Sequence, residues 1–300
     1  MSAGRDFLGP YRLVRLVRSG QTCQIWEAVR EGETGRLALK ILLEHQRKNK
    51  HQIGMLKREA EIGSQLDSPY LIRVFEFNNS FGLPFVAMEL FNAKNLKQEM
   101  RENSERIAFY ATEIIRRCAK ALGYMHEHDW IHCDVKPDNY LVNEKAEIKL
   151  IDFAISQRWK KKAGLMGFLG GGTKNISGTR SYMSPEQIRG KGLDPRSDIY
   201  SLGCLIYEML SGKLPYAGVS ADDLLSKHLR AQVPNVAAVN KSVSSDMANL
   251  IQEMMAKKPN DRPESIDAFL KKFKAIQVYR PGQKPEDPDA KNANTEDKKS

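Results

Sequence analysis

The chain has 300 residues, of which 41% are hydrophobic and 28% charged, a composition that is typical of an ordinary globular protein with a sizeable core. Its net charge of +10 allows nucleic acid, anionic lipid or acidic protein as a partner, but no stripe of arginines and aromatic residues indicates a nucleic-acid platform, so we expect no nucleic-acid partner. The longest apolar run, residues 199–210, is shorter than the roughly 20 residues that cross a bilayer, so we expect no transmembrane segment.

Cysteine usage and the beginning of the chain indicate the compartment. The four cysteines show neither a C-x-x-C pair nor the histidine spacing of a zinc site, so we expect reduced thiols. The first thirty residues contain arginines and no continuous apolar run, which excludes a secretory signal. A cytoplasmic location is therefore expected.

The first third of the chain is predicted to be rich in β-strands. After an N-terminal extension of residues 1–10, strands are expected at 11–17 and 24–29 around a turn that contains Gly20, and a third strand at 37–42. Apolar residues at helical spacing then place Glu59 in a helix that stops before Ser68 and Pro69. Two more strands, 71–75 and 85–89, complete a small sheet with one main helix.

From Ser104 onward the pattern becomes helical. Apolar residues between Ile107 and Met125 recur at helical spacing and predict one amphipathic helix, and the chain is mostly helical to about Ile276. Residues 277–300 are rich in charged residues, proline and asparagine, which predicts a disordered tail. The expected fold class is α+β, with a β-rich part at about 11–90 and a larger, mostly helical part at about 91–276.

The residues 131–139, Ile-His-Cys-Asp-Val-Lys-Pro-Asp-Asn, indicate a phosphoryl-transfer loop. Asp134 offers a carboxylate that can orient a hydroxyl, Lys136 a cation for a phosphoryl group, and Asn139 an amide ligand for Mg²⁺. Asp152, after the strand-like residues 147–150, offers a second metal ligand. Such a short motif also arises by chance, and an aspartate in a loop is more often a turn former, so its weight depends on partners elsewhere.

The β-rich part, the helical part and these spaced residues together resemble the bilobal protein-kinase fold, closest to bacterial Ser/Thr kinases of the eukaryotic type. The resemblance covers about residues 11–276, with an N-lobe at about 11–90 and a C-lobe at about 91–276. Lys40 in Leu-Ala-Leu-Lys matches the lysine of the family's Val-Ala-Ile-Lys motif, and Glu59 matches the helix glutamate that pairs with it. The alternative, a surface salt bridge, is disfavoured by the spacing to the other motifs.

The resemblance also implies an ATP pocket. Met88 would be the gatekeeper residue, and backbone groups of Glu89 and Phe91 would face the adenine edge. For any one of these positions, packing in a half-buried strand is the simpler explanation, and only their joint placement favours ATP. The residues expected to bind the nucleotide are Gly20, Ile25, Ala38, Lys40, Glu59, Met88, Glu89, Phe91 and Leu141.

Residues 178–186, Gly-Thr-Arg-Ser-Tyr-Met-Ser-Pro-Glu, resemble the segment that receives a peptide substrate and ends in the family's Ala-Pro-Glu. The resemblance implies that Glu186 pairs with Arg262 and that Asp198 braces the backbone of the catalytic loop. Together with residues 134–139, Thr179 indicates the Ser/Thr branch rather than the tyrosine branch.

The chain departs from the family pattern at several positions. Of the glycines in G-x-G-x-x-G only Gly20 is kept, because Arg18 and Cys23 stand at the outer positions. Side chains there would hinder backbone approach to phosphate, although Arg18 would partly compensate by its charge. Cys133 replaces the arginine before the catalytic aspartate, and Gly63 stands where a larger apolar residue is usual, which predicts a looser helix around Glu59.

The activation segment between Asp152 and Glu186 is long. It contains three lysines, 160–162, three glycines, 170–172, and an apolar group at 165–169. A lysine run is usually a solvated face, so a dedicated acidic or membrane partner is the less favoured interpretation. The apolar group is expected to dock on the protein itself or on a partner.

The resemblance implies an active Ser/Thr protein kinase that transfers the γ-phosphoryl group of ATP to protein hydroxyls. Asp134, Lys136 and Asn139 would be catalytic, Asn139 and Asp152 would hold Mg²⁺, and Lys40 would fix the α- and β-phosphates. A pseudokinase that binds nucleotide without catalysis is the main alternative, favoured by the altered glycine loop. A small-molecule phosphotransferase is disfavoured by the peptide-docking segment. The sequence leaves the substrate protein and the oligomeric state open.

Overall fold

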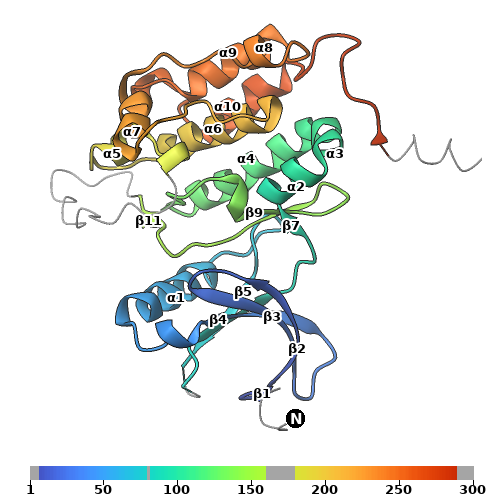
Figure 1. Ribbon diagram of the computed structural model, residues 1–300, viewed down its shortest axis with the longest axis vertical. Helices are drawn as coiled ribbons and strands as arrows, with labels where there is room; N and C mark the ends of the chain where they lie inside the picture. The colour runs from blue at the N-terminus through green and yellow to red at the C-terminus, as the bar shows by residue number, and fades with distance from the viewer. Residues whose placement is uncertain (1–6, 80–81, 160–179, 289–300) are drawn as a thin grey trace, which may run out of the picture. The chain divides into compact units, whose positions relative to one another are not determined.

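The computed structural model describes residues 7–79, 82–159 and 180–288, and the chain divides into two units (Figure 1). The first comprises Met1–Asn92 and Lys149–Ser156, and the second comprises Ala93–Ile148 and Gln157–Ser300. The predicted lobe boundary near residue 90 lies close to Asn92. Residues 149–156, which include Asp152, also belong to the first unit, although no sequence pattern predicts this.

The first unit contains a six-stranded antiparallel sheet, in the order β1-β2-β3-β4-β6-β5. One face carries a cluster of buried apolar residues that includes Tyr11, Leu39 and Phe85. The hydroxyl of Tyr11 donates to Glu76 Oε1 at 2.7 Å, which ties β2 to the far edge strand β5. The strands are β1 (Phe7–Leu8), β2 (Tyr11–Ser19), β3 (Cys23–Arg30), β4 (Arg36–Leu42), β5 (Val74–Asn78) and β6 (Phe85–Glu89).

Strand β2 contains an Arg-Leu-Val repeat. In a regular strand, side chains three residues apart point to opposite faces of the sheet, so this repeat would place arginines on both faces. Its register with β3 shifts between Leu13 and Arg15 and again between Leu16 and Arg18. Each shift inserts one extra residue, so side chains three apart return to the same face. The arginines therefore share one face of the sheet. Leu13 and Leu16 lie on the opposite face, which carries the apolar cluster. The cross-strand pairs on the arginine face are Arg12 with Val29, Arg15 with Glu27 and Arg18 with Ile25.

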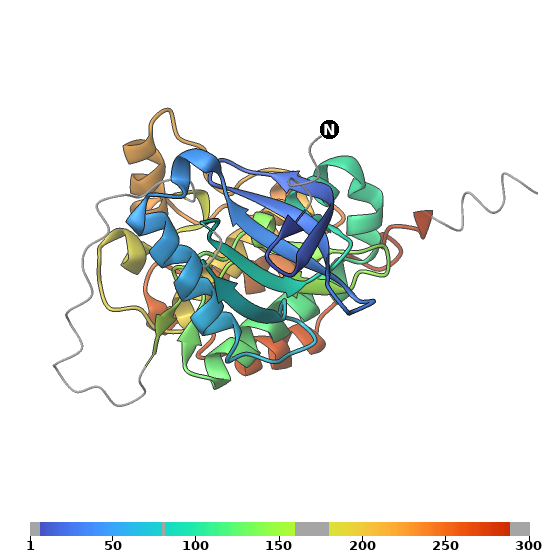
Figure 2. The same cartoon turned by 90° about the horizontal axis from the view of Figure 1, so that it is seen from below.

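Helix α1 (Lys50–Gly63) packs on β5 and β6, across one face of the sheet (Figure 2). It begins at Asn49, whose side chain accepts hydrogen bonds from the amides of His51 and Gln52 and so satisfies two free donors of the first turn. Leu56, Ala60 and Gly63 are buried at helical spacing, as is Glu59. The helix thus holds a carboxylate against the sheet within an apolar stripe.

The second unit is mostly helical, and its centre is α6, whose side chains are buried along nearly the whole helix. α4 and α9 pack against α6, and α10 packs on α4 (Figure 1). The helices are α2 (Leu96–Glu102), α3 (Ser104–Phe109), α4 (Ala111–Glu127), α5 (Pro185–Ile188), α6 (Arg196–Ser211), α7 (Ala221–Arg230), α8 (Val236–Val239), α9 (Ser245–Met254) and α10 (Ile266–Lys274). Within the described residues, none of the helices has the length and apolar character required to cross a membrane.

The second unit also contains several short strands. β7 pairs with β9, and β8 pairs with β11. Short 3-10 helices occur at Glu44–Gln46, Pro137–Asn139, Arg180–Tyr182 and Pro259–Asp261. The strands are β7 (Lys94–Asn95), β8 (Trp130–Ile131), β9 (Tyr140–Val142), β10 (Ile148–Leu150), which crosses the boundary between the units, and β11 (Gln157–Arg158).

Three sequence predictions need correction. The strand expected at 71–75 begins only at Val74, because Leu71 forms an isolated parallel bridge with Leu150. The single helix expected from Ser104 is two helices, since the backbone at Tyr110 leaves the helical conformation. The tail predicted to be disordered from residue 277 is anchored at its start, where Val278 and Tyr279 are buried. Residues 289–300 lie outside the described part of the chain.

Candidate active site

The residues 131–139 form a loop between β8 and β9, and three of its polar side chains are locked together. Lys136 Nζ lies 2.7 Å from Asp134 Oδ2. The amide nitrogen of Asn139 donates to Asp134 O at 2.8 Å and to Asp134 Oδ2 at 2.9 Å. Because Nδ2 is used in this way, the Oδ1 atom of Asn139 is left as the acceptor of that amide. The loop therefore presents a carboxylate, an ammonium group and an amide oxygen from one fixed backbone.

Asp198, in the first turn of α6, binds the backbone of this loop. Its carboxylate accepts from His132 N at 2.8 Å and from Cys133 N at 3.0 Å, and His126 Nε2 lies 2.8 Å from Oδ2. Cys133 adopts a φ of 68°, a conformation that costs energy in a residue with a side chain. The predicted bracing role of Asp198 is confirmed, and it stabilises this strained backbone directly before Asp134.

At the position before Asp134, the Cys133 side chain adds no charge. Its sulfur contacts the carbonyl of Ile131 at 3.5 Å, and its own carbonyl accepts from Gln187 Nε2 at 2.8 Å. The neighbouring cation Arg158 stacks over the ring of Trp130 at 4.2 Å and donates to the carbonyl of His128. Arg158 is therefore held by its own contacts.

In the first unit, Lys40 of β4 makes the predicted ion pair with Glu59 of α1, at 2.6 Å. Asp152 Oδ1 lies 3.8 Å from the same ammonium group. Burial acts to lower the pKa of Lys40, because it disfavours the charged form. The carboxylates of Asp152 and Glu59 together have the larger effect, and the pKa of Lys40 is raised. Burial also raises the pKa of Glu59, against the attraction of Lys40. Lys40 stays protonated and is held by carboxylates on both sides.

The predicted adenine-covering residues of the sheet share the face of Lys40. Ile25 is the cross-strand partner of Lys40, and Ala38 is the partner of Met88, which is buried. Directly opposed residues project to the same face, so these apolar side chains flank the ammonium group. Leu141, from β9 in the second unit, pairs with Asn95.

Of the two residues expected to face the adenine edge, Glu89 has its amide already engaged. Its N–H donates to the carbonyl of Arg73 at 2.8 Å, and its side chain pairs with Lys149 at 2.9 Å. Only the carbonyl of Glu89 is therefore available as a backbone contact for a ligand at this strand end. The corresponding contact of Phe91 stays a prediction.

The turn between β2 and β3 contains Gly20 and is closed by a backbone hydrogen bond. The amide of Gly20 donates to the carbonyl of Cys23 at 2.8 Å, within the hairpin. A Cβ at Gly20 would lie 3.3 Å from that carbonyl, so the turn is tight. Burial raises the pKa of the Cys23 thiol, although Lys40 opposes the shift. Cys23 is thus a neutral side chain.

A buried ion pair holds the end of the segment 178–186, which is predicted to receive the substrate. Arg262 donates to both carboxylate oxygens of Glu186, at 2.7 and 2.8 Å, and Ser197 adds a third hydrogen bond. Burial opposes ionisation, but Arg262 lowers the pKa of Glu186. The predicted Glu186–Arg262 pair is confirmed. Thr179, the lysines 160–162, the glycines 170–172 and the apolar group 165–169 lie outside the described residues.

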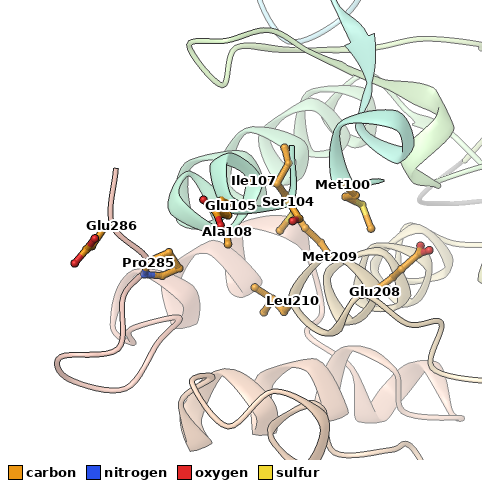
Figure 3. A pocket seen from close by; sticks show the side chains of 11 residues that line it. Met100, Ser104, Glu105, Ile107, Ala108, Glu208, Met209, Leu210, Pro285 and Glu286 are labelled. Atoms are coloured by element: carbon orange, nitrogen blue, oxygen red, sulfur yellow. The ribbon is translucent and has the colours of Figure 1, made fainter. Parts of the chain in front are cut away.

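Sequence reasoning missed Glu208 of α6, which is 4% exposed. Lys97 pairs with its carboxylate, as does the hydroxyl of Tyr182 in the 3-10 helix before Glu186. Glu208 also borders a cavity of about 440 Å³, with an apolar wall that includes Ile107 and Leu210 (Figure 3). The only sequence signal was a glutamate near the end of the mostly apolar stretch 199–210. The cavity contains none of the predicted catalytic residues.

The donor atoms fit the metal that the resemblance implies. Mg²⁺ prefers hard oxygen ligands, and the Asp152 carboxylate and the Asn139 amide oxygen are of that kind. Asp152 adopts a φ of 69°, a second strained backbone position at a predicted functional residue. A bound cation of this type would supply charge stabilisation for phosphate oxygens.

Comparisons with known proteins were made for the whole chain. A family model described as "Protein kinase domain" matches residues 11–273. Serine/threonine-protein kinase PrkC of Bacillus subtilis is 29% identical over 267 residues, which cover 89% of this chain and 40% of the relative. Serine/threonine-protein kinase PknA of Mycobacterium tuberculosis is 29% identical over 290 residues, or 95% of this chain and 64% of the relative.

A third relative is more distant. Probable serine/threonine-protein kinase PknB of Lactococcus lactis is 26% identical over 268 residues, which cover 89% of this chain and 42% of the relative. The chain therefore spans about two fifths of the length of PrkC and of this PknB.

Proposed function

Because the chain belongs to the protein kinase domain family, we propose that it transfers the γ-phosphoryl group of ATP to serine and threonine hydroxyls of proteins. The curated relatives are named as serine/threonine-protein kinases, which supports this choice of acceptor. The four cysteines are free thiols, which supports a reducing, cytoplasmic setting. The identity of the substrate protein is left open by this proposal.

The observation that carries the proposal is the locked group of Asp134, Lys136 and Asn139. Asp134 would accept the hydrogen bond of the incoming hydroxyl and orient its oxygen toward the phosphorus atom. Lys136, 2.7 Å from Asp134, would stabilise the charge on the transferred group. Both side chains are held before substrate binds, so little reorganisation is needed during transfer.

Most of the nucleotide contacts would come from residues of the first unit, whereas Leu141 and Asn139 belong to the second. Lys40, fixed by Glu59, would hold the α- and β-phosphates, while Ile25, Ala38, Met88 and Leu141 would surround the adenine. Asn139 and Asp152 would be the protein ligands of Mg²⁺. The contacts of Gly20, Glu89 and Phe91 would come from their backbone groups.

The proposal is tested by removing a carboxylate without changing its size. We expect Asp134→Asn and Asp152→Asn to reduce the transfer of labelled phosphate to a generic basic protein by roughly two orders of magnitude or more, because charge stabilisation is lost at the transfer step. Melting temperatures should change by only a few degrees, the effect of about 1 kcal/mol or less. Asp222→Asn, at an exposed helix start, is the matched control and should keep full activity.

A nucleotide-binding pseudokinase is the second candidate, and the closed Gly20–Cys23 turn is the observation that favours it. Wild-type protein that binds ATP but transfers no more phosphate than Asp134→Asn would establish it. Wild-type protein that transfers phosphate to a small molecule and to no protein would instead contradict the assigned acceptor.

A further inference from the structure

We propose that Arg18 binds the phosphates of the nucleotide, taking over part of the role that backbone amides have in a glycine-rich loop. This inference rests on the proposed ATP binding and names a residue for it. Four observations in the first unit carry it: the face on which Arg18 lies, the charge balance around Lys40, the engaged amide of Gly20, and the exposure of Arg18 itself.

The register of β2 places Arg18 on the nucleotide face of the sheet. Arg18 is the cross-strand partner of Ile25, and Ile25 is in turn the partner of Lys40 on β4. The shift between Leu16 and Arg18 makes Val17 the extra residue and returns Arg18 to the face of Ile25. Without this bulge, Arg18 would project to the opposite side of the sheet. The strand is thus built so that an arginine faces the same side as the phosphate-binding lysine.

The charged side chains around Lys40 carry a net negative charge, which a bound polyphosphate would increase. Lys40 is 2.6 Å from Glu59 and 3.8 Å from Asp152, so one positive charge faces two negative ones. A bound Mg²⁺ would compensate part of this excess, but a triphosphate itself brings several negative charges. A guanidinium group is always protonated and presents donors in a planar fork that matches phosphate oxygens.

The backbone at the turn cannot supply all of the contacts that a glycine-rich loop normally offers. The amide of Gly20 donates to the carbonyl of Cys23 within the hairpin. The side chains of Arg18 and Cys23 occupy the positions where glycine permits the closest approach of the backbone. A long charged side chain that reaches the phosphates from a greater distance replaces that approach.

Arg18 is also available, unlike Arg15 and Arg36 on the same face. Arg15 and Arg36 are both bound to the buried carboxylate of Glu27. Arg18 is exposed, and no ion pair is recorded for it among the described residues. Arg12 is likewise exposed and lies on the same face, but opposite Val29, farther from Ile25 along the strand.

The test is a calorimetric titration of the full chain with MgATP and, separately, with adenosine. We expect Arg18→Gln to weaken MgATP binding about tenfold or more, since a charge-assisted contact is lost, and to leave adenosine binding unchanged. Arg18→Lys should recover a large part of the affinity. Arg12→Gln removes an equal charge from the same strand face and should bind MgATP within about twofold of wild type. The loss caused by Arg18→Gln should shrink as salt rises.

The titrations distinguish a failure of nucleotide binding itself from a failure of the Arg18 assignment alone. Wild-type protein that binds neither MgATP nor adenosine would overturn the proposed nucleotide binding, and the role of Arg18 with it. Equal MgATP affinity of wild type and Arg18→Gln, or equal losses in Arg18→Gln and Arg12→Gln, would overturn the Arg18 assignment alone. A parallel loss of adenosine affinity would also overturn it, because the effect would then not involve the phosphates.

Discussion

At Gly63, the end of α1 comes so close to β5 that no side chain fits. A Cβ built at this position would lie 2.4 Å from Val74 Cγ2 and 3.2 Å from Phe153 Cδ2. The expectation that a small residue here would loosen the helix around Glu59 is therefore wrong. Val74 and Phe153 fill the space from the other side, and the packing is complementary.

We predict that Gly63→Ala destabilises the protein by about 1–3 kcal/mol, because the added methyl group overpacks this contact. Val74→Ala, introduced into the Gly63→Ala variant, should recover part of the loss by making room. Gly54→Ala is the matched control, since Gly54 lies in the same helix with no atoms near its Cβ position. It should stabilise the protein by about 0.5–1 kcal/mol. Urea unfolding measures all four proteins, and a neutral Gly63→Ala would contradict the packing argument.

At the scale of elements, α6 and α7 enclose a buried polar group, His228. Tyr200 Oη lies 2.9 Å from its Nδ1, and the ring of Tyr216 packs against it. Burial and the positive charge of Lys257 lower the pKa of His228 to about 4. The same burial lowers the pKa of Lys257 to about 8. The junction of these helices therefore favours a neutral histidine.

The lowered pKa of His228 predicts that the folded protein loses stability as the pH falls. An unfolded histidine titrates near pH 6.5, so between about pH 6.5 and pH 4 the unfolded chain binds a proton that the folded chain does not. His228 contributes stability that is full above that range and is lost as the pH falls through it, by roughly 1.4 kcal/mol per pH unit. Urea unfolding at several pH values should show a shallower slope for His228→Gln than for wild type. His45→Gln, at an exposed site, should keep the wild-type slope.

Most helices and strands could be predicted from the sequence because their patterns of buried residues are local. The prediction was incomplete where contacts with residues far along the chain determine the backbone conformation. The strand at 11–17 was expected, but its two bulges were not, because they depend on the cross-strand position of Glu27, which pairs with Arg15. The apolar spacing runs smoothly through Tyr110, yet the helix breaks there, since spacing alone does not report backbone conformation.

At the scale of the molecule, the Glu186–Arg262 pair joins segments of the second unit that are far apart in sequence. Both side chains are almost fully buried, and Arg262 also donates to the carbonyls of Arg196 and Ala256. Removing either partner leaves an uncompensated buried charge. The pair therefore links α5, the start of α6 and the segment before α10 into one arrangement.

We predict that Arg262→Met destabilises the protein by about 3–5 kcal/mol, the usual effect of breaking a buried ion pair. The double variant Glu186→Gln/Arg262→Met should be less destabilised than the sum of its single variants, because the charge on Glu186 is then removed as well. Lys57→Ala, which breaks the exposed pair with Glu61, should change stability by about 0.5 kcal/mol or less. Strictly additive losses would show that the two side chains act independently.

The polar residues of the candidate site were predictable from the sequence because the chemistry restricts both residue type and spacing. The contacts that support them were less visible. Glu208, bound by Lys97 and Tyr182, left no motif, since these two partners come from two segments far from it in the sequence. The position of Arg18 depends on a bulge, and the engaged amide of Gly20 on a turn, so the sequence could only suggest their consequences for nucleotide binding.

The side chain of Cys133 bears on how the proposed phosphoryl transfer would be controlled. In related kinases an arginine at this position binds a phosphate on the activation segment and orders it. Cys133 offers no such contact, and Arg158 is engaged with Trp130 and the carbonyl of His128. Without an arginine at this position, a phosphate on the segment has no bidentate partner directly before Asp134. The loop is instead held by Asp198, which requires no phosphate.

We therefore predict that phosphorylation of the activation segment is not required for activity. Thr173→Ala/Ser177→Ala and phosphatase-treated wild type should keep most of the untreated rate of phosphate transfer. Asp198→Asn is the positive control, since weaker bracing of the strained Cys133 backbone should lower the rate in phosphorylated and unphosphorylated protein alike. A tenfold or larger loss in the double variant, about 1.4 kcal/mol on the barrier, would contradict this view. It would mean that a cation other than the missing arginine connects a phosphate to the catalytic loop, and Arg158→Gln would then identify or exclude Arg158 as that cation.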